Sequence, residues 1–205
     1  MTKPRKFYDG DPEKELMART KAFEREEVLH HAIRVFAEHG FAGTSMEMLL
    51  EAMGLSRQSI YDTFGDKKQL YTAALGLYVN DSIGEIVASL VRSDSPARAI
   101  EEAIEQFIAR PAAQGCLGIL SVCEFGIQDD EISRINAVAG KRLLRALEGT
   151  LLRGQAHGDF TKEQTAEQMA GYLAVLLNGL RVASRAGASQ DELLVMKTIA
   201  LRALR

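Results

Sequence analysis

The stretch from Thr44 to Lys67, TSMEMLLEAMGLSRQSIYDTFGDK, constrains the fold more than any other part of the sequence. Thr44 precedes a helical apolar pattern and Glu47 follows three residues later, which predicts a capping box and a helix that starts at Thr44. Gly54 should end this helix, because glycine adopts the left-handed conformation without steric cost. Apolar residues recur at spacings of three and four along one face: Met46, Leu49 and Met53.

A second short helix is expected after this glycine. Ser56 should cap it, and it should end near Phe64, with Ile60 and Phe64 on its buried face. The outward face is polar and carries Arg57, Gln58, Ser59, Tyr61 and Thr63. A small polar helix held by a preceding helix and a sharp turn fits the DNA major groove, so the pattern predicts a helix-turn-helix that binds DNA.

The longer segment GFAGTSMEMLLEAMGLSRQSIYDTFGDKKQLY resembles the DNA-binding domain of the TetR family of bacterial transcriptional regulators. The matching positions are Gly40-Phe41, Thr44, Gly54-Leu55-Ser56, Tyr61, Phe64 and Lys67. The resemblance covers about Glu24 to Leu75; beyond it, only the chain length and the helical pattern are similar to the family. It implies phosphate binding by Tyr61 and Lys67, and base or phosphate contacts by Arg57, Gln58, Ser59 and Thr63.

The chemistry of individual residues adds detail to these expected contacts. The hydroxyl of Thr44 and the backbone amides of Ser45 and Met46 can bind one phosphate. An ordinary N-cap is the alternative at Thr44, and both roles can hold together. At the start of the second helix, Arg57 favours guanine and Gln58 favours adenine.

Three positions bear on which DNA sequence is preferred. Many members of the family have glycine where this chain has Gln58, and histidine where it has Thr63, so the preferred operator should depend on these two residues. Asp62 carries a charge that repels phosphate. It could accept a hydrogen bond from cytosine, orient Arg57 or Lys67, or point away from DNA.

Composition favours an all-α chain of 205 residues, because 46% of the residues are apolar and no window alternates with a period of two. The formal net charge is −3, so overall charge gives no separate support for DNA binding. No stretch approaches eighteen uninterrupted apolar residues, which favours a cytoplasmic protein. We find no nucleophile and base pair, phosphate loop or metal-ligand set, and therefore expect no catalytic residues and no cofactor.

We expect three parts in the chain: a mobile N-terminal tail (1–22), a three-helix DNA-binding domain (23–70) and a helical ligand-binding and dimerisation domain (71–205). Some helix after Pro12 is compatible with the tail, and RSDSP at 92–96 marks the clearest internal turn. The predicted helices are Glu24–His39, Thr44–Met53, Ser56–Phe64, Lys67–Leu90, Pro96–Arg110, Leu117–Phe125, Asp129–Gln155 with an interruption at Gly140, Thr161–Ala186 and Gln190–Leu204.

The resemblance implies a ligand pocket between helices of the C-terminal domain. Residues that could line it are Phe107, Leu120, Cys123, Glu124, Tyr172, Leu176 and Arg181. The alternative is that the apolar members are ordinary core residues. Glu124 and Arg181 are charges in apolar surroundings and should need a partner or a solvated cavity.

The cysteines and histidines do not predict a redox or metal centre. Cys116 and Cys123 lie about two helical turns apart, roughly 10 Å, which is too far for a disulfide. We interpret them as buried inert thiols, with a redox or electrophile sensor as the alternative. The histidines are expected at the surface or as caps: His30, His31 and His39.

The last two predicted helices carry more apolar surface than one neighbour would cover, together with several small residues. This favours a four-helix interface between two copies, whereas a monomeric bundle core is the alternative. A homodimer would suit a palindromic operator, and a small-molecule effector would release it. We therefore expect a DNA-binding transcriptional regulator, most simply a repressor. A helical ligand carrier, an enzyme and a protein-binding adaptor are the rival interpretations.

Overall fold

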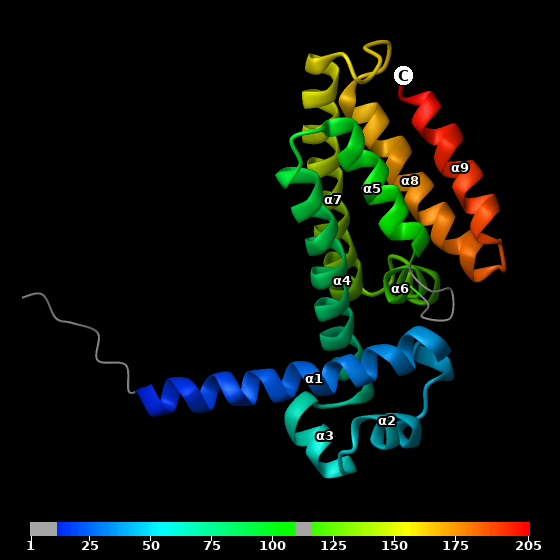
Figure 1. Ribbon diagram of the computed structural model, residues 1–205. Helices are drawn as coiled ribbons and strands as arrows, with labels where there is room; N and C mark the ends of the chain where they lie inside the picture. The colour runs from blue at the N-terminus through cyan, green and yellow to red at the C-terminus, as the bar shows by residue number, and fades with distance from the viewer. Residues whose placement is uncertain (1–11, 110–115) are drawn as a thin grey trace, which may run out of the picture.

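The computed structural model describes the backbone of residues 12–109 and 116–205, with side chains from residue 25 onward in those ranges. Throughout these ranges the chain is helical, without a strand (Figure 1). The helices are α1 (Pro12–Gly43), α2 (Met46–Met53), α3 (Arg57–Phe64), α4 (Lys67–Arg92), α5 (Pro96–Ala109), α6 (Leu117–Phe125), α7 (Asp130–His157), α8 (Ala166–Arg185) and α9 (Gln190–Ala203). The all-α prediction is confirmed.

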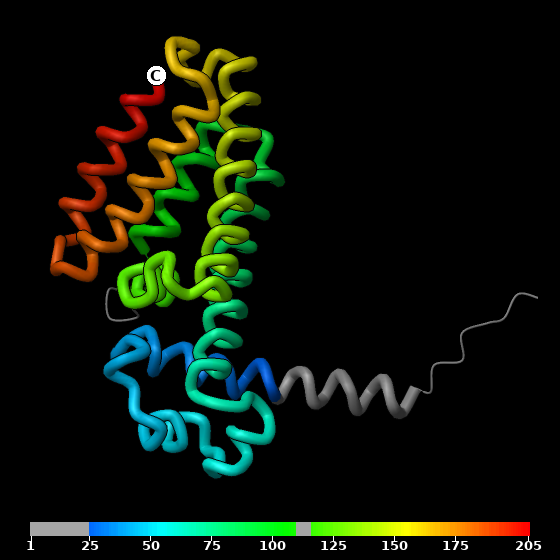
Figure 2. The backbone as a smooth tube through the Cα atoms, turned by 180° about the vertical axis from the view of Figure 1, so that it is seen from behind, coloured from blue at the N-terminus to red at the C-terminus, as the bar shows by residue number. Residues whose placement is uncertain are grey.

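Helix α4 connects two parts of the molecule. It rises from the layer of α1, α2 and α3 into an elongated bundle with α5, α7, α8 and α9, and α6 lies between the two (Figures 1 and 2). Leu70 and Leu75 pack in the N-terminal core, whereas Ile86 and Leu90 pack in the core of the C-terminal bundle. Among the described helices only α4 is long and apolar enough to cross a membrane. It contributes buried side chains to both cores.

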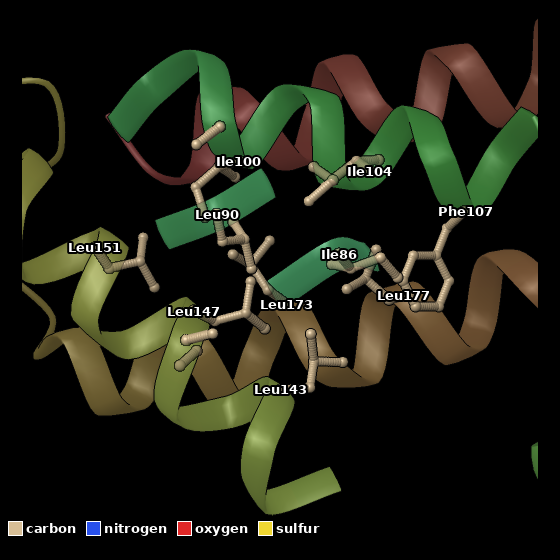
Figure 3. Packing of buried hydrophobic residues seen from close by; sticks show 14 of the residues in the cluster. Ile86, Leu90, Ile100, Ile104, Phe107, Leu143, Leu147, Leu151, Leu173 and Leu177 are labelled. Carbon is tan, nitrogen blue, oxygen red and sulfur yellow. The ribbon is translucent and has the colours of Figure 1, made fainter. Parts of the chain in front are cut away.

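The core of the bundle follows from the apolar spacing of its helices. Ile100, Ile104 and Phe107 recur on one face of α5 and are buried. Figure 3 shows them packed against α4, α7 and α8, where the facing side chains are Ile86, Leu90, Leu143, Leu147, Leu151, Leu173 and Leu177.

The helix boundaries agree with the sequence prediction for α3, α5 and α6 to within one residue. The predicted break at Gly140 is wrong, because α7 runs without interruption to His157. Helix α8 starts five residues later than Thr161, because Thr165 caps it: the Thr165 hydroxyl accepts from the amide of Gln168 at 3.2 Å.

The N-terminal tail was predicted to be mobile up to residue 22. Residues 12–22 belong to α1, in agreement with the helix that the sequence allows after Pro12, and the remaining residues lie outside the described part. The mobility of the tail stays a prediction. The division at residue 70 stays a prediction, since α4 runs through this position as a continuous helix.

Candidate DNA interface

The N-cap of helix α2 lies one residue later than the sequence predicts. Ser45 is its N-cap: the Ser45 hydroxyl accepts from the amide of Met48 at 3.2 Å, and the thioether of Met48 lies 3.5 Å from the amide of Ser45. Thr44 is buried, and its hydroxyl donates to the carbonyl of Gly40 at 2.6 Å. The predicted capping box of Thr44 with Glu47 is therefore wrong. The Thr44 hydroxyl is committed to Gly40 in this conformation, and its contact with a phosphate stays a prediction.

The turn between α2 and α3 forms as predicted. Gly54 ends α2 with φ 64° and ψ 25°, the left-handed conformation, and its amide donates to the carbonyl of Leu50 at 3.0 Å. Ser56 then caps α3, because its hydroxyl accepts from the amide of Ser59 at 3.1 Å. Ile60 and Phe64 are buried in the N-terminal core. This burial fixes which face of α3 points to solvent.

That face presents the predicted DNA contacts. Arg57, Gln58 and Thr63 are exposed, Tyr61 is 43% exposed, and Ser59 is half-buried. Of the two residues at the start of α2, Ser45 is exposed and Met46 is half-buried. A short helix whose polar side chains project from its first turns can enter the DNA major groove.

Two hydrogen-bonded pairs hold the side chains that are predicted to read bases. Arg57 forms an ion pair with Glu47 of α2 at 2.6 Å, and the amide of Gln58 donates to Asp62 at 2.7 Å. Hydrogen bonds from its own backbone amide and from Ser45, together with the charge of Arg57, lower the pKa of Glu47. Glu47 is therefore a charged carboxylate beside the surface that would face DNA.

The two lysines at the start of α4 have different surroundings. Lys67 is half-buried, with its ammonium 4.4 Å from the ring centroid of Phe41. Lys68 forms an ion pair with Asp129 at the start of α7 and lies over the ring of Phe125. The charge of Lys68 is thus paired within the protein, whereas Lys67 has no carboxylate partner among the ion pairs of the described residues.

The predicted pocket residues differ in how far they are buried. Cys123 and Tyr172 are exposed, and Leu120 is half-buried on α6. Phe107, Leu176 and Arg181 are the members that lie in the bundle, where the guanidinium of Arg181 donates to the carbonyl of Phe107 at 3.4 Å. The charge at Arg181 thus has a partner, as its surroundings required.

Glu124 lies at the surface between α6 and the end of α1. Its carboxylate accepts from the amides of Phe41 at 2.8 Å and Ala42 at 3.2 Å. The sequence predicts that this charge needs a partner. The partner is the backbone at the end of α1, and not a group in a pocket. Sequence reasoning could not find this pairing, because 82 or more positions separate the partners.

The thiols are more exposed than predicted. Cys116 is half-buried at the N-cap of α6 and Cys123 is exposed, so the interpretation as buried thiols is wrong. Of the three histidines, His30 and His39 are exposed and His31 is half-buried beside Arg34. The described residues contain no group of three His, Cys, Asp or Glu side chains that could hold a metal ion.

Comparison with known proteins identifies the chain. Residues 28–74 match the family model described as bacterial regulatory proteins, tetR family. The chain is 32% identical over 182 residues to the uncharacterized HTH-type transcriptional regulator YezE of Bacillus subtilis (strain 168), which covers 86% of this chain and 94% of that protein. It is 25% identical over 199 residues to the HTH-type transcriptional repressor ComR of Escherichia coli (strain K12), covering 92% of each.

A solved structure gives the same result for the whole fold. A cysteine mutant of the TetR family transcriptional regulator CifR, complexed with 26 bp double-strand operator DNA, superimposes with a TM-score of 0.77 at 26% identity. The match covers 88% of this chain and 97% of that one. The chain therefore belongs to the tetR family of bacterial regulatory proteins and is a DNA-binding transcriptional regulator, not an enzyme.

Proposed function

We propose that this regulator is a repressor that binds a palindromic operator as a homodimer and is released by a small-molecule effector. One observation carries the DNA-binding mode: α3 buries Ile60 and Phe64 and turns its polar face to solvent. The relative ComR is named a transcriptional repressor, and CifR is described in complex with operator DNA, which supports repression through this surface. Because the operator lies on DNA inside the cell, we place the protein in the cytoplasm.

We assign the contacts on α3 by their chemistry. Tyr61 and Lys67 bind phosphates, since a phenolic hydroxyl and an ammonium both donate to phosphate oxygens. Arg57, Gln58, Ser59 and Thr63 read or flank base edges in the major groove. At the start of α2, the amides of Ser45 and Met46 remain candidates for a phosphate, because a helix N-terminus favours an anion. Asp62 orients Gln58 through the hydrogen bond that joins them.

Dimerisation is supported by the distribution of exposed apolar side chains. Half of the large ones among the described residues lie on α8 and α9: Tyr172, Val175, Val182, Leu194, Val195, Met196 and Ile199. The same face of α8 carries Gly179, where an added Cβ would meet nothing within 4 Å. Two copies related by a two-fold axis would cover these faces and present two α3 helices to one side of DNA.

The small-molecule effector also needs a site. We place it in the C-terminal bundle near Phe107, Leu176 and Arg181, which lie on α5 and α8. A ligand there releases the operator only if it binds the DNA-free arrangement more tightly than the DNA-bound one.

The DNA-binding mode is tested by gel shifts on the DNA flanking the gene, over a salt series. Tyr61→Ala and Lys67→Ala should weaken binding to all sequences, and Lys67→Ala should reduce the salt slope by about 1. Arg57→Ala and Gln58→Ala should instead change which base is preferred, at a cost of about 1–3 kcal/mol for the best sequence.

Lys141→Ala is the matched control for loss of a cation, because Lys141 is exposed on α7, remote in sequence from α3. It should bind as the parent does. If folded Tyr61→Ala and Arg57→Ala proteins also bind operator as the parent does, the proposed mode is wrong.

A further inference from the structure

The end of α1 contains a turn that only glycine can form without strain. Gly40 has φ 72° and ψ 178°, which interrupts the helical path between His39 and Phe41. A Cβ on Gly40 would also lie 2.6 Å from a carboxylate oxygen of Glu124, closer than van der Waals contact allows. The Gly40 turn is thus both conformationally special and tightly covered.

Glu124 holds the chain immediately after this turn. Its two carboxylate oxygens accept from two consecutive amides, those of Phe41 and Ala42. These amides begin the short helical turn that leads to Gly43, where a negative charge is favoured. Hydrogen bonds to a charged acceptor are the stronger kind. Helix α6 is thereby fixed to the segment that precedes α2.

Arg185 holds the chain immediately before the turn. This residue is at the end of α8, and its guanidinium donates to the carbonyls of Ala37 at 3.1 Å and Glu38 at 3.3 Å. Carbonyls at the end of a regular helical stretch lack partners within the helix and favour a positive charge. The two sides of Gly40 therefore contact side chains of opposite charge from two helices of the C-terminal part.

We propose that Glu124 and Arg185 form a clamp on the Gly40 turn and are positioning residues for DNA binding. The clamp sets the direction in which the helix-turn-helix leaves α1, and so sets the separation of the two α3 helices in a dimer. This inference rests on the proposed binding of a palindromic operator by a homodimer. Through the clamp, a movement of α6 or α8 would change the position of the DNA-binding surface without a movement of α4.

Substitution of the two side chains can change the position of the helix-turn-helix without unfolding the protein. Both Glu124 and Arg185 are exposed, and neither belongs to either hydrophobic core. Their removal should therefore leave both cores intact while freeing the turn.

The surroundings of the clamp contain an unsatisfied polar group. Tyr71 is fully buried against Phe36, Phe41 and Phe125, with ring centroids 4.9–5.4 Å apart, and its hydroxyl lacks a hydrogen-bond partner among the described residues. Such a group favours any rearrangement that supplies an acceptor. Since Phe41 follows Gly40 and Phe125 follows Glu124, this cluster would respond to a shift of α6 relative to α1.

Glu124→Gln and Arg185→Ala in the full chain test the clamp. The test uses operators whose half-site separations differ in steps of one base pair. The parent protein should bind one separation clearly more tightly than the others. Each variant should bind the preferred operator about tenfold more weakly or worse, and should lose much of its preference among separations. In Glu124→Gln, hydrogen exchange at the amides of Phe41 and Ala42 should become about tenfold faster or more.

Glu163→Gln and Arg134→Ala are the charge-matched controls, because both side chains are exposed and lie outside the clamp. They should match the parent in affinity, separation preference and exchange. The clamp is overturned if Glu124→Gln keeps both amides protected. It is also overturned if both clamp variants keep the parent's affinity and separation preference, or bind more tightly.

The proposed function fails in a different way. If the parent binds a single half-site as tightly as the palindrome, the dimeric mode is wrong. Amide exchange and affinity for that half-site then test the clamp. Faster exchange together with weaker binding in the clamp variants supports the clamp. If either property is unchanged, the clamp is overturned.

Discussion

At the scale of single residues, we expect the ion pair between Arg57 and Glu47 to set the balance between DNA affinity and sequence selectivity. The pair orients the guanidinium across the turn, but Glu47 also places a negative charge beside the surface that faces phosphates. We therefore expect Glu47→Gln to strengthen binding to non-specific DNA and to lower the ratio of operator affinity to non-specific affinity, by about threefold or more. Competition gel shifts measure this ratio.

Glu51→Gln is the control, since Glu51 is exposed on the same helix. It removes an equal charge without freeing Arg57, so any change common to both variants reports net charge alone. A ratio that is the same in Glu47→Gln and Glu51→Gln would show that the ion pair does not orient Arg57.

Residue-scale prediction from sequence succeeded where the signal was local. The Ser56 cap, the Gly54 turn and the burial of Ile60 and Phe64 depend on neighbours within a few positions, and all are present. The cap of α2 was misplaced because Thr44 and Ser45 are equally suitable, and the choice depends on the hydroxyl of Thr44 reaching the carbonyl of Gly40. That bond requires the unusual Gly40 turn, which no propensity predicts.

At the scale of helices, α7 contains two glycines with opposite expected effects. Gly154 packs against α5 and the following loop: a Cβ there would overlap the ring of Phe160 and lie 3.2 Å from Pro96. Gly149 meets nothing within 4 Å. Gly154→Ala should lower the free energy of unfolding by about 1–3 kcal/mol, whereas Gly149→Ala should raise it by up to about 1 kcal/mol through helix propensity.

Thermal and denaturant unfolding of the two variants measure these changes. Both variants replace glycine by alanine in the same helix. The difference between their free energies of unfolding therefore reports the close approach of Phe160 to α7. Equal effects of the same sign would show that the helix moves to accommodate the methyl group.

The same helix shows why its predicted interruption failed. Gly140 weakens a helix by its propensity alone, but Ile132, Leu143 and Leu147 are buried on either side of it. Packing of long helices provides more stabilisation than one glycine removes. The low helix propensity of glycine can be read from the sequence. The packing partners of α7 lie on α4, α5 and α8, and the local sequence of α7 does not reveal them.

At the scale of the whole molecule, the pairing between domains was beyond sequence reasoning. Each helix was found from its own periodicity, and the family resemblance placed the DNA contacts on α3. The contacts of Glu124, Arg185 and Lys68 join residues more than 60 positions apart, so no local pattern encodes them. These contacts join the N-terminal part of the molecule to α6, α8 and the start of α7.

The apolar face of α8 and α9 leads to the last prediction, which concerns assembly. Val175 is 74% exposed on α8, and in the proposed dimer it would be buried against the partner. A buried, unpaired carboxylate is strongly unfavourable, so Val175→Glu should convert the dimer to a folded monomer.

Val138→Glu is the control, because Val138 is 64% exposed on α7, outside the proposed interface. Sedimentation velocity should show a monomer for Val175→Glu and a dimer for Val138→Glu. Operator affinity should fall only in the former, because one DNA-binding domain then loses the effective concentration supplied by the second. A Val175→Glu protein that remains dimeric would place the interface elsewhere on the molecule.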